Sequence, residues 1–105
     1  MLLGLMPTAT AAALLPLGAR PVRRRLGEVD LKVWRTGPTD GEPWILLHGM
    51  GSTALSWRAP LGRLRGDCRV LVPELSELGG TRCPRHGLGV GDGVAAILEL
   101  ARSEF

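Results

Sequence analysis

The sequence predicts an α/β fold in which parallel strands are connected by a helix. Two short apolar runs, residues 44–48 and 69–72, have the composition of buried strands. Between them, Trp57, Leu61 and Leu64 recur at the spacing of one helix face. A helix that joins two apolar strands is typical of a crossover unit, in which both strands run in the same direction.

The sequence before this crossover unit predicts an antiparallel β-hairpin. Residues 21–26 and 29–35 have strand character, and Gly27 lies at the turn between them. In the second strand, apolar side chains alternate with others, which indicates one buried face. The alternation also puts Arg23 and Arg25 together on one face of an edge hairpin. We interpret them as a solvated strand face rather than a binding patch.

The crossover unit itself begins after a loop over residues 36–43. In the strand 44–48 the four residues before His48 are all apolar, so we expect this strand to be buried on both faces. The helix that follows carries Pro60 in its first turn, where proline is tolerated, and Gly66 ends it.

The last part of the chain predicts a long loop and one more helix. Residues 73–93 include six glycines and two prolines, the composition of a loop. Asp92 is the expected N-cap of a helix over residues 93–102. Only two parallel strands are therefore expected, which is the beginning of an α/β sheet rather than a finished one.

Composition limits the classes of function. The 105 residues suffice for one small domain, and a hydrophobic fraction of 45% is that of a globular protein. The net charge of +3 is mild, and the basic residues do not form a dense basic face with aromatic residues among them. We therefore expect no nucleic-acid partner. Cys68 and Cys83 lack further ligands at metal-binding spacing, which favours two reduced thiols and no metal site. The glycine-rich stretch 87–93 does not fit a dinucleotide-binding loop, and no cofactor is implied.

The first nineteen residues carry no charge and are rich in Leu and Ala. Pro7 and Pro16 interrupt the apolar patches, so neither a signal peptide core nor a transmembrane span fits. We therefore expect residues 1–20 to be a poorly ordered leader, with the folded domain over 21–105. A cytoplasmic location follows from this view, while secretion or membrane association through residues 1–19 stays open.

The turn after the first apolar strand is the strongest chemical signal in the chain. His48-Gly49-Met50-Gly51 follows the strand directly, and the second strand runs into Val72-Pro73-Glu74-Leu75 and then Gly79-Gly80-Thr81. These motifs and their spacing resemble the N-terminal third of an α/β-hydrolase over residues 21–105. The family commonly has Asp where this chain has Glu74, and Gly where it has Glu77, so the loop departs from the family pattern.

The resemblance implies an oxyanion hole. In the family, the loop after the third strand supplies one backbone N–H to this hole. By position, the donor here would be the backbone N–H of Met50, with His48, Gly49 and Gly51 shaping the turn, and His48 would not be a catalytic base. A backbone donor fixed at a strand end needs no reorganisation as negative charge develops. The alternative is a glycine turn between a strand and a helix that binds nothing.

No catalytic triad is present in the sequence. The family places its nucleophile in G-x-S-x-G, and none of the four serines has that surrounding. His86 lies in a glycine-rich loop and is interpreted as a solvated loop residue. Glu74 and Glu77 are interpreted as a polar loop rather than a paired-carboxylate or cation site.

Two hypotheses for function remain. The first is an N-terminal fragment of a serine hydrolase that ends before the nucleophile elbow, inactive alone, whose parent hydrolyses a small-molecule ester or thioester. The absence of Pro after the first Gly of the turn favours acyl-transfer relatives over epoxide- or halide-processing ones. The second is a non-catalytic interaction protein whose half-sheet is completed by a partner strand. Whether the chain is an enzyme therefore stays open, and both hypotheses imply an exposed apolar edge along residues 44–48.

Overall fold

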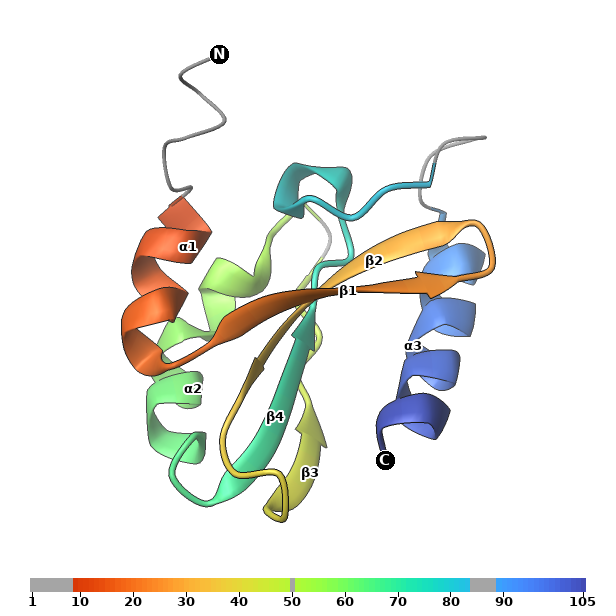
Figure 1. The fold of residues 1–105 in the computed structure, drawn as a ribbon. Helices are drawn as coiled ribbons and strands as arrows, with labels where there is room; N and C mark the ends of the chain where they lie inside the picture. Colours follow the sequence, from red (N-terminus) through yellow and green to blue (C-terminus); the bar gives the residue numbers. More distant parts are fainter. Residues whose placement is uncertain (1–8, 50, 84–88) are drawn as a thin grey trace.

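A four-stranded mixed sheet forms the centre of the computed structural model, which describes residues 9–49, 51–83 and 89–105. The strand order is β1-β2-β4-β3, with helices α1 and α2 on one face of the sheet and α3 on the other (Figure 1). This arrangement confirms the predicted α/β class. The strands are β1 (Arg20–Leu26), β2 (Val29–Thr36), β3 (Glu42–Ile45) and β4 (Cys68–Pro73), and the α-helices are α1 (Ala9–Leu14), α2 (Arg58–Leu64) and α3 (Val90–Glu104).

The predicted hairpin and crossover unit are both confirmed. Strands β1 and β2 pair antiparallel across a turn in which Gly27 has a φ of 63°, a conformation that glycine adopts without steric cost. Strands β3 and β4 pair parallel, and α2 lies between them in the chain. Because β4 also pairs antiparallel with β2, it joins the hairpin to the parallel part of the sheet.

The expected burial of the first parallel strand is wrong. Trp44 is 41% exposed in β3, which lies at the edge of the sheet and, among the described residues, pairs only with β4. Leu47, two residues beyond the end of β3, is 46% exposed. An interior strand would have neighbours on both sides, which is the setting that an apolar run normally indicates. The accompanying expectation of an exposed apolar edge is confirmed.

The structure also differs from the expectation of a poorly ordered leader. Residues Ala9–Leu14 form α1, and the short 3₁₀ turn Leu15–Leu17 (η2) connects it to β1. Leu14 is fully buried, and Thr10 and Thr53 hydroxyls lie 3.2 Å apart, which ties α1 to the loop before α2. A Leu- and Ala-rich segment without charge can form a helix wherever an apolar surface receives it. The part of the expectation that concerns residues 1–8 lies outside the described residues.

Two apolar clusters hold the layers together, one on each face of the sheet. On the α1 and α2 face, Trp34 is 1% exposed and packs with Leu14, Leu61 and Val72. The second strand of the hairpin is thus covered on both faces at Trp34, although its alternation predicted one solvated face. On the opposite face α3 contributes Ala96 and Leu100 to a cluster with five residues of the sheet side: Val29, Leu31, Val33, Leu71 and Cys83.

Helix α3 begins earlier than predicted. The N-cap is Gly89 rather than Asp92, and Asp92 lies three residues later, where its Oδ2 accepts the backbone N–H of Gly89 at 3.0 Å. An acidic residue that reaches back to the N-cap amide is half of a capping box, so the same side chain stabilises the helix start from inside the first turn. No described helix is long and apolar enough to cross a membrane.

The C-terminal end of α3 is held to the sheet by a shared carboxylate. Glu104 lies between Arg24 of β1 and Arg69 of β4, with a 2.7 Å contact from Arg24 Nη2 to Oε1 and a 3.1 Å contact from Arg69 Nη2 to Oε2. The Glu104 side chain is only 10% exposed. Charge-assisted bonds of this kind are stronger than neutral ones.

We therefore expect Glu104→Gln to destabilise the chain by about 1–3 kcal/mol, because both contacts lose their charge assistance and the partly exposed Arg24 and Arg69 are left without this counter-charge. Urea unfolding followed by circular dichroism measures the change. The control is Glu99→Gln, which removes an exposed pair with Arg102 on the same helix and should cost at most about 0.5 kcal/mol. Equal effects of the two substitutions would contradict the bridging role of Glu104.

Candidate functional site

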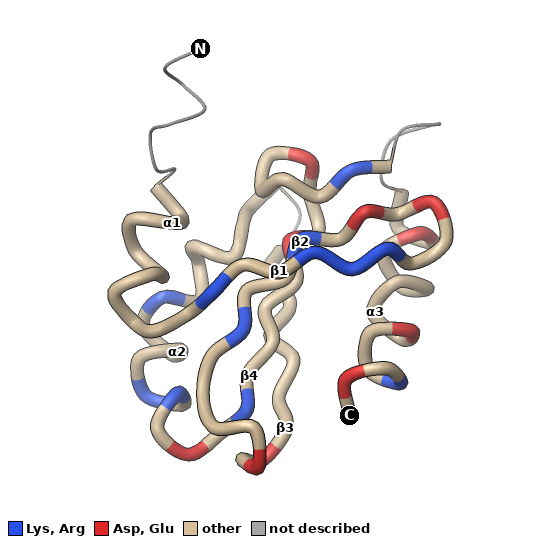
Figure 2. The backbone as a smooth tube through the Cα atoms, viewed as in Figure 1, with Lys and Arg blue, Asp and Glu red and all other residues tan. Residues whose placement is uncertain are grey.

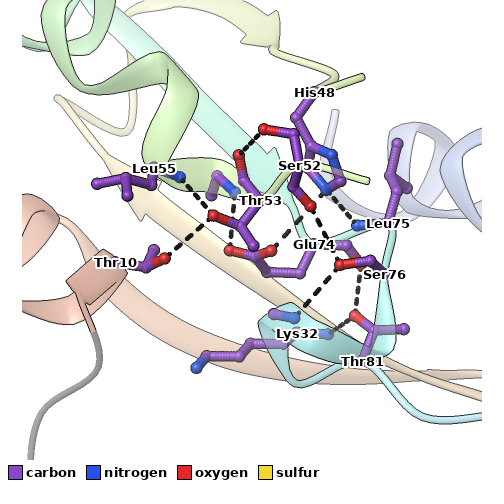
Figure 3. Close-up of polar contacts among 12 residues, drawn as sticks. Thr10, Lys32, His48, Ser52, Thr53, Leu55, Glu74, Leu75, Ser76 and Thr81 are labelled. Atoms are coloured by element: carbon purple, nitrogen blue, oxygen red, sulfur yellow. Dashed lines mark hydrogen bonds and ion pairs between the residues drawn. The ribbon is translucent and has the colours of Figure 1, made fainter. Parts of the chain in front are cut away.

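The loops that leave the carboxyl ends of β3 and β4 lie side by side and are joined by hydrogen bonds (Figure 3). The backbone N–H of Leu75 donates to Nε2 of His48 at 2.8 Å. The hydroxyl of Ser76 donates to the carbonyl of Ser52 at 3.2 Å. Since parallel strands end at the same edge of a sheet, this edge is where a ligand is generally bound in an α/β fold.

His48 is a structural member of this edge. Because Nε2 accepts the Leu75 N–H, the ring proton lies on Nδ1, which faces the carbonyl of Gly49 at 2.8 Å. The side chain is 1% exposed, so both nitrogens are occupied and shielded from solvent. A ring held in this way orients the glycine turn and has no free nitrogen for proton transfer. That His48 is not a catalytic base stays a prediction.

Glu74 is the central buried group of the site. It is fully buried immediately after β4, and its Oε1 accepts the backbone N–H of Ala54 at 3.0 Å. Its Oε2 lies 3.8 Å from Nε2 of His48 and has no hydrogen-bond partner of normal geometry among the described residues. The nearby indole N–H of Trp34 is likewise buried and unbonded. One carboxylate therefore joins the loop after β4 to the start of the segment Ala54–Trp57 (η3).

Burial raises the pKa of the Glu74 carboxyl above its ordinary value of 4.5. The Ala54 hydrogen bond, His48, the Trp34 indole and Lys32 act in the opposite direction and do not outweigh the loss of solvent. The protonated form is consequently favoured in the folded chain compared with the unfolded chain.

A closed set of hydrogen bonds holds the backbone around Glu74. The Thr81 hydroxyl donates to the carbonyl of Glu74 and accepts the N–H of Lys32 at 3.0 Å, while the N–H of Glu74 donates to the carbonyl of Lys32 at 2.8 Å. An isolated bridge between Asp30 and Arg82 continues the pairing along β2. The segment 74–82 is thereby fastened to β2 at both ends, although it contains no strand of its own.

Gly79 leaves the space that the longer Glu74 side chain needs. A Cβ atom at position 79 would overlap Oε2 and Cδ of Glu74. Gly79 does not have a positive φ, so its importance lies in close approach rather than in backbone conformation. The departure from the family's usual Asp at position 74 is therefore accommodated by this contact with Gly79.

A cavity of about 740 Å³ opens beside the two loops and reaches α3. Its wall includes the glycine turn at Gly49 and Gly51, the loop residues Leu75 and Leu78, and Val94 of α3. Gly51 has a φ of 77°, a region that favours glycine, and no atom lies within 4 Å of a Cβ built there. The turn is therefore open on the cavity side, and a bound group can approach its backbone closely.

The structure brings together part of the predicted oxyanion loop. His48, Gly49 and Gly51 lie in the loop that follows β3, whereas Met50, the predicted donor, lies outside the described residues. His86 also lies outside them. All four serines serve local structure: Ser52 and Ser76 link the two loops, Ser56 donates to the carbonyl of Thr53 at 3.0 Å, and Ser103 donates to the carbonyl of Leu100 at 3.2 Å.

Sequence reasoning missed two residues of the site. Glu74 was interpreted as part of a polar loop, yet it is fully buried, and Thr81, also fully buried, closes the network around it. The available signal was positional, since both lie where the family has a carboxylate and a hydroxyl residue. Composition alone predicts that Glu74 is exposed, because an acidic residue in a glycine-rich loop is normally solvated.

Within the described ranges, no three His, Cys, Asp or Glu side chains converge on a point that could hold a metal ion. Cys68 and Cys83 are buried free thiols, as predicted. Burial and the surrounding carboxylates raise the pKa of the Cys83 thiol, which makes its reactive thiolate form less accessible.

Comparison with solved structures finds proteins of one fold. A membrane phospholipase A shares 16% identity with a TM-score of 0.76, over 87% of this chain and 30% of the phospholipase. The thioesterase domain from the curacin biosynthetic pathway shares 16% identity with a TM-score of 0.72, over 81% of this chain and 31% of that domain. Haloalkane dehalogenase DbeA from Bradyrhizobium elkani shares 21% identity with a TM-score of 0.68, over 79% and 30% of the two chains.

Comparison by sequence finds a relative that is named as a chelatase subunit and not as a hydrolase. The magnesium-chelatase 30 kDa subunit of Rhodobacter capsulatus is 40% identical over 67 residues, which are 64% of this chain and 24% of that subunit. No family model matches the chain. The chain thus spans about a quarter of the length of this curated relative and about 30% of the solved structures.

Glu74→Gln should stabilise the chain at neutral pH and flatten its pH dependence. Between pH 4.5 and the raised pKa, the folded chain binds more protons at Glu74 than the unfolded chain does, so the contribution of this group to the free energy of unfolding falls as pH rises through that interval. Glutamine keeps an acceptor for the Ala54 N–H without the buried charge. Thermal unfolding from pH 4 to 8, compared with the exposed control Glu77→Gln, measures the difference. If both variants show the same pH dependence of unfolding as the parent chain, the buried charge of Glu74 does not cause that dependence.

Gly79→Ala should destabilise the chain by about 1–3 kcal/mol, because the added methyl group overlaps the Glu74 carboxylate. The matched control is Gly62→Ala in α2, where the nearest atom lies 4.0 Å away and alanine should be neutral or stabilising by up to about 1 kcal/mol. Adding Glu74→Asp to Gly79→Ala should recover part of the loss, since the shorter side chain withdraws from position 79. Strictly additive effects in this cycle, measured by urea unfolding, would refute the contact.

Proposed function

We propose, starting from the α/β-hydrolase fold that this chain has, that it contributes the oxyanion-hole side of a hydrolase acting on an ester or thioester. The observation that carries the proposal is the glycine turn at the carboxyl end of β3, which opens on the 740 Å³ cavity. The backbone N–H of Met50 is the proposed donor. A fixed donor of this kind is worth about 3 kcal/mol of transition-state stabilisation.

The surrounding contacts support a rigid turn. His48 is held through Leu75, and Ser52 is held through Ser76, so the chain is fixed on both sides of residues 49–51. Glu74 fastens the following segment through the N–H of Ala54. Preorganised donors are effective because they need not move when charge develops on the substrate oxygen.

The cavity wall favours an apolar acyl group. It is lined mainly by aliphatic side chains and glycines, and Glu77 is the only Asp, Glu, Lys or Arg among the described residues that line it. An uncharged acyl chain would lie against Leu47, Leu75 and Ile97. The phospholipase and thioesterase among the structural neighbours are named for ester and thioester substrates, which is consistent with this class.

The nucleophile, base and acid would come from residues other than these 105. The sequence contains no G-x-S-x-G, and His48 is fully engaged in its two contacts. We therefore expect the 105-residue chain alone to give no turnover of p-nitrophenyl esters above the buffer rate. Saturable hydrolysis that scales with the amount of chain would overturn this expectation.

A second candidate function is supported by the sequence relative. The 40% identity to the magnesium-chelatase 30 kDa subunit favours a role as a subunit of an assembly of that kind. The open edge of β3, with Trp44 and Leu47 exposed, is a surface that a partner strand could cover. Magnesium would then be a substrate of the assembly rather than a ligand of this chain.

The oxyanion proposal can be tested by grafting residues 48–52 into the thioesterase domain that resembles this chain. The graft should retain thioester hydrolysis, and the same graft with Met50→Pro should lose about 10²–10³-fold in kcat, because proline has no N–H to donate. Met50→Ala keeps the N–H and serves as the control. Equal kcat values for the Pro and Ala grafts, both folded by circular dichroism, would refute the role of Met50.

The assembly candidate has a separate test. Co-expression of the chain with the other subunits of a magnesium chelatase, followed by size-exclusion chromatography, should give a stoichiometric complex if this function is correct. Asp substitutions at Trp44 and Leu47 should abolish that complex if β3 is the contact. Elution of the chain apart from every chelatase subunit would leave the hydrolase proposal as the supported one.

A further inference from the structure

A second, smaller cavity lies away from the strand-end loops and is lined by three arginines. Its volume is about 160 Å³, and its wall includes Arg20 of β1, Arg35 of β2 and Arg69 of β4. The hydroxyl residues Thr36 and Thr39 complete the polar part of the wall. Basic positions recur on β1, β2 and β4, which are neighbours in the sheet (Figure 2).

The strand register forces these charges together. Arg20 lies directly opposite Arg35 in the β1–β2 pair, and Arg35 lies opposite Leu71 in the β2–β4 pair. Arg69 is two residues before Leu71 and therefore projects on the same face of β4. Like charges placed directly opposite each other on a sheet are destabilising.

The described part of the chain supplies little negative charge to compensate. Arg69 bonds Glu104, but that carboxylate is shared with Arg24. No carboxylate within the described residues forms an ion pair with Arg20 or Arg35, and Nη1 of Arg20 donates to the carbonyl of Ala19 at 3.4 Å. The cavity therefore has a clear excess of positive charge together with the Thr39 hydroxyl, whereas the Thr36 hydroxyl donates to the carbonyl of Leu17 at 3.4 Å.

We propose that this cavity binds a phosphoryl group. Three guanidinium groups and the Thr39 hydroxyl match an anion with several acceptor oxygens, since guanidinium forks bind phosphate with paired hydrogen bonds. The volume of 160 Å³ is below the roughly 300–1,000 Å³ of drug-sized ligand sites, so the ligand is a small ion or the phosphate end of a larger molecule. This site is independent of the proposed hydrolase function.

The test is isothermal titration of the 105-residue chain with inorganic phosphate and, in a second arm, with glycerol 3-phosphate, at constant ionic strength in sodium chloride. Arg35→Gln should weaken binding by about tenfold or more, the cost of losing a charge-assisted contact. Arg63→Gln on α2 is the matched control, with the same change in charge at an exposed position outside the cavity, and should leave the affinity unchanged. Equal affinity for both ligands identifies the phosphoryl group alone as the determinant, and tighter binding of glycerol 3-phosphate identifies a phosphomonoester.

Thermal unfolding separates a binding role from a structural one. In chloride buffer without phosphate, Arg35→Gln should raise the unfolding temperature, because it relieves the repulsion with Arg20. Phosphate should raise the unfolding temperature of the parent chain and of Arg63→Gln but not of Arg35→Gln. The proposal is overturned if the parent binds neither ligand, or if Arg35→Gln binds them as tightly as the parent does.

Discussion

The buried carboxylate of Glu74 is the interaction on which the arrangement of this chain depends. It follows β4 directly, bonds the N–H of Ala54 before α2, and lies 3.8 Å from the His48 ring at the end of β3. A charge without solvent is costly unless its surroundings compensate. The neighbours of Glu74 offset this cost only in part, as the raised pKa of the carboxyl indicates.

The same network explains why the glycine turn can be both open and fixed. Glycines at 49 and 51 free the backbone of side-chain bulk, which by itself would make the turn mobile. The hydrogen bonds of His48 and Ser52 to the neighbouring loop counteract this freedom from either side. The two described residues that flank the turn, His48 and Ser52, are therefore held by the loop after β4, whose own shape depends on Thr81 and Lys32.

The sequence predicts local structure well and burial less well. The hairpin, α2 and the parallel pair follow from periodicity, because each pattern is set by residues close together in the chain. The exposure of Trp44 and the burial of Glu74 depend instead on which strands are neighbours, and that information is not local. The helix α1 was missed for the same reason: its apolar residues indicate a helix only once Trp34 and Leu61 provide a surface for Leu14.

The central position of β4 has a consequence for the order in which the chain can fold during synthesis. The β1–β2 hairpin is complete once residue 36 has been made, but Glu42 of β3 has to wait for its partner Cys68, 26 positions later. Until then β3 and its apolar side chains are unpaired beside a two-stranded hairpin, which has only marginal stability in isolation. When β4 emerges, it can pair with the β1–β2 hairpin on one side and with β3 on the other. We therefore expect the sheet to fold cooperatively, with the availability of β4 limiting the folding rate.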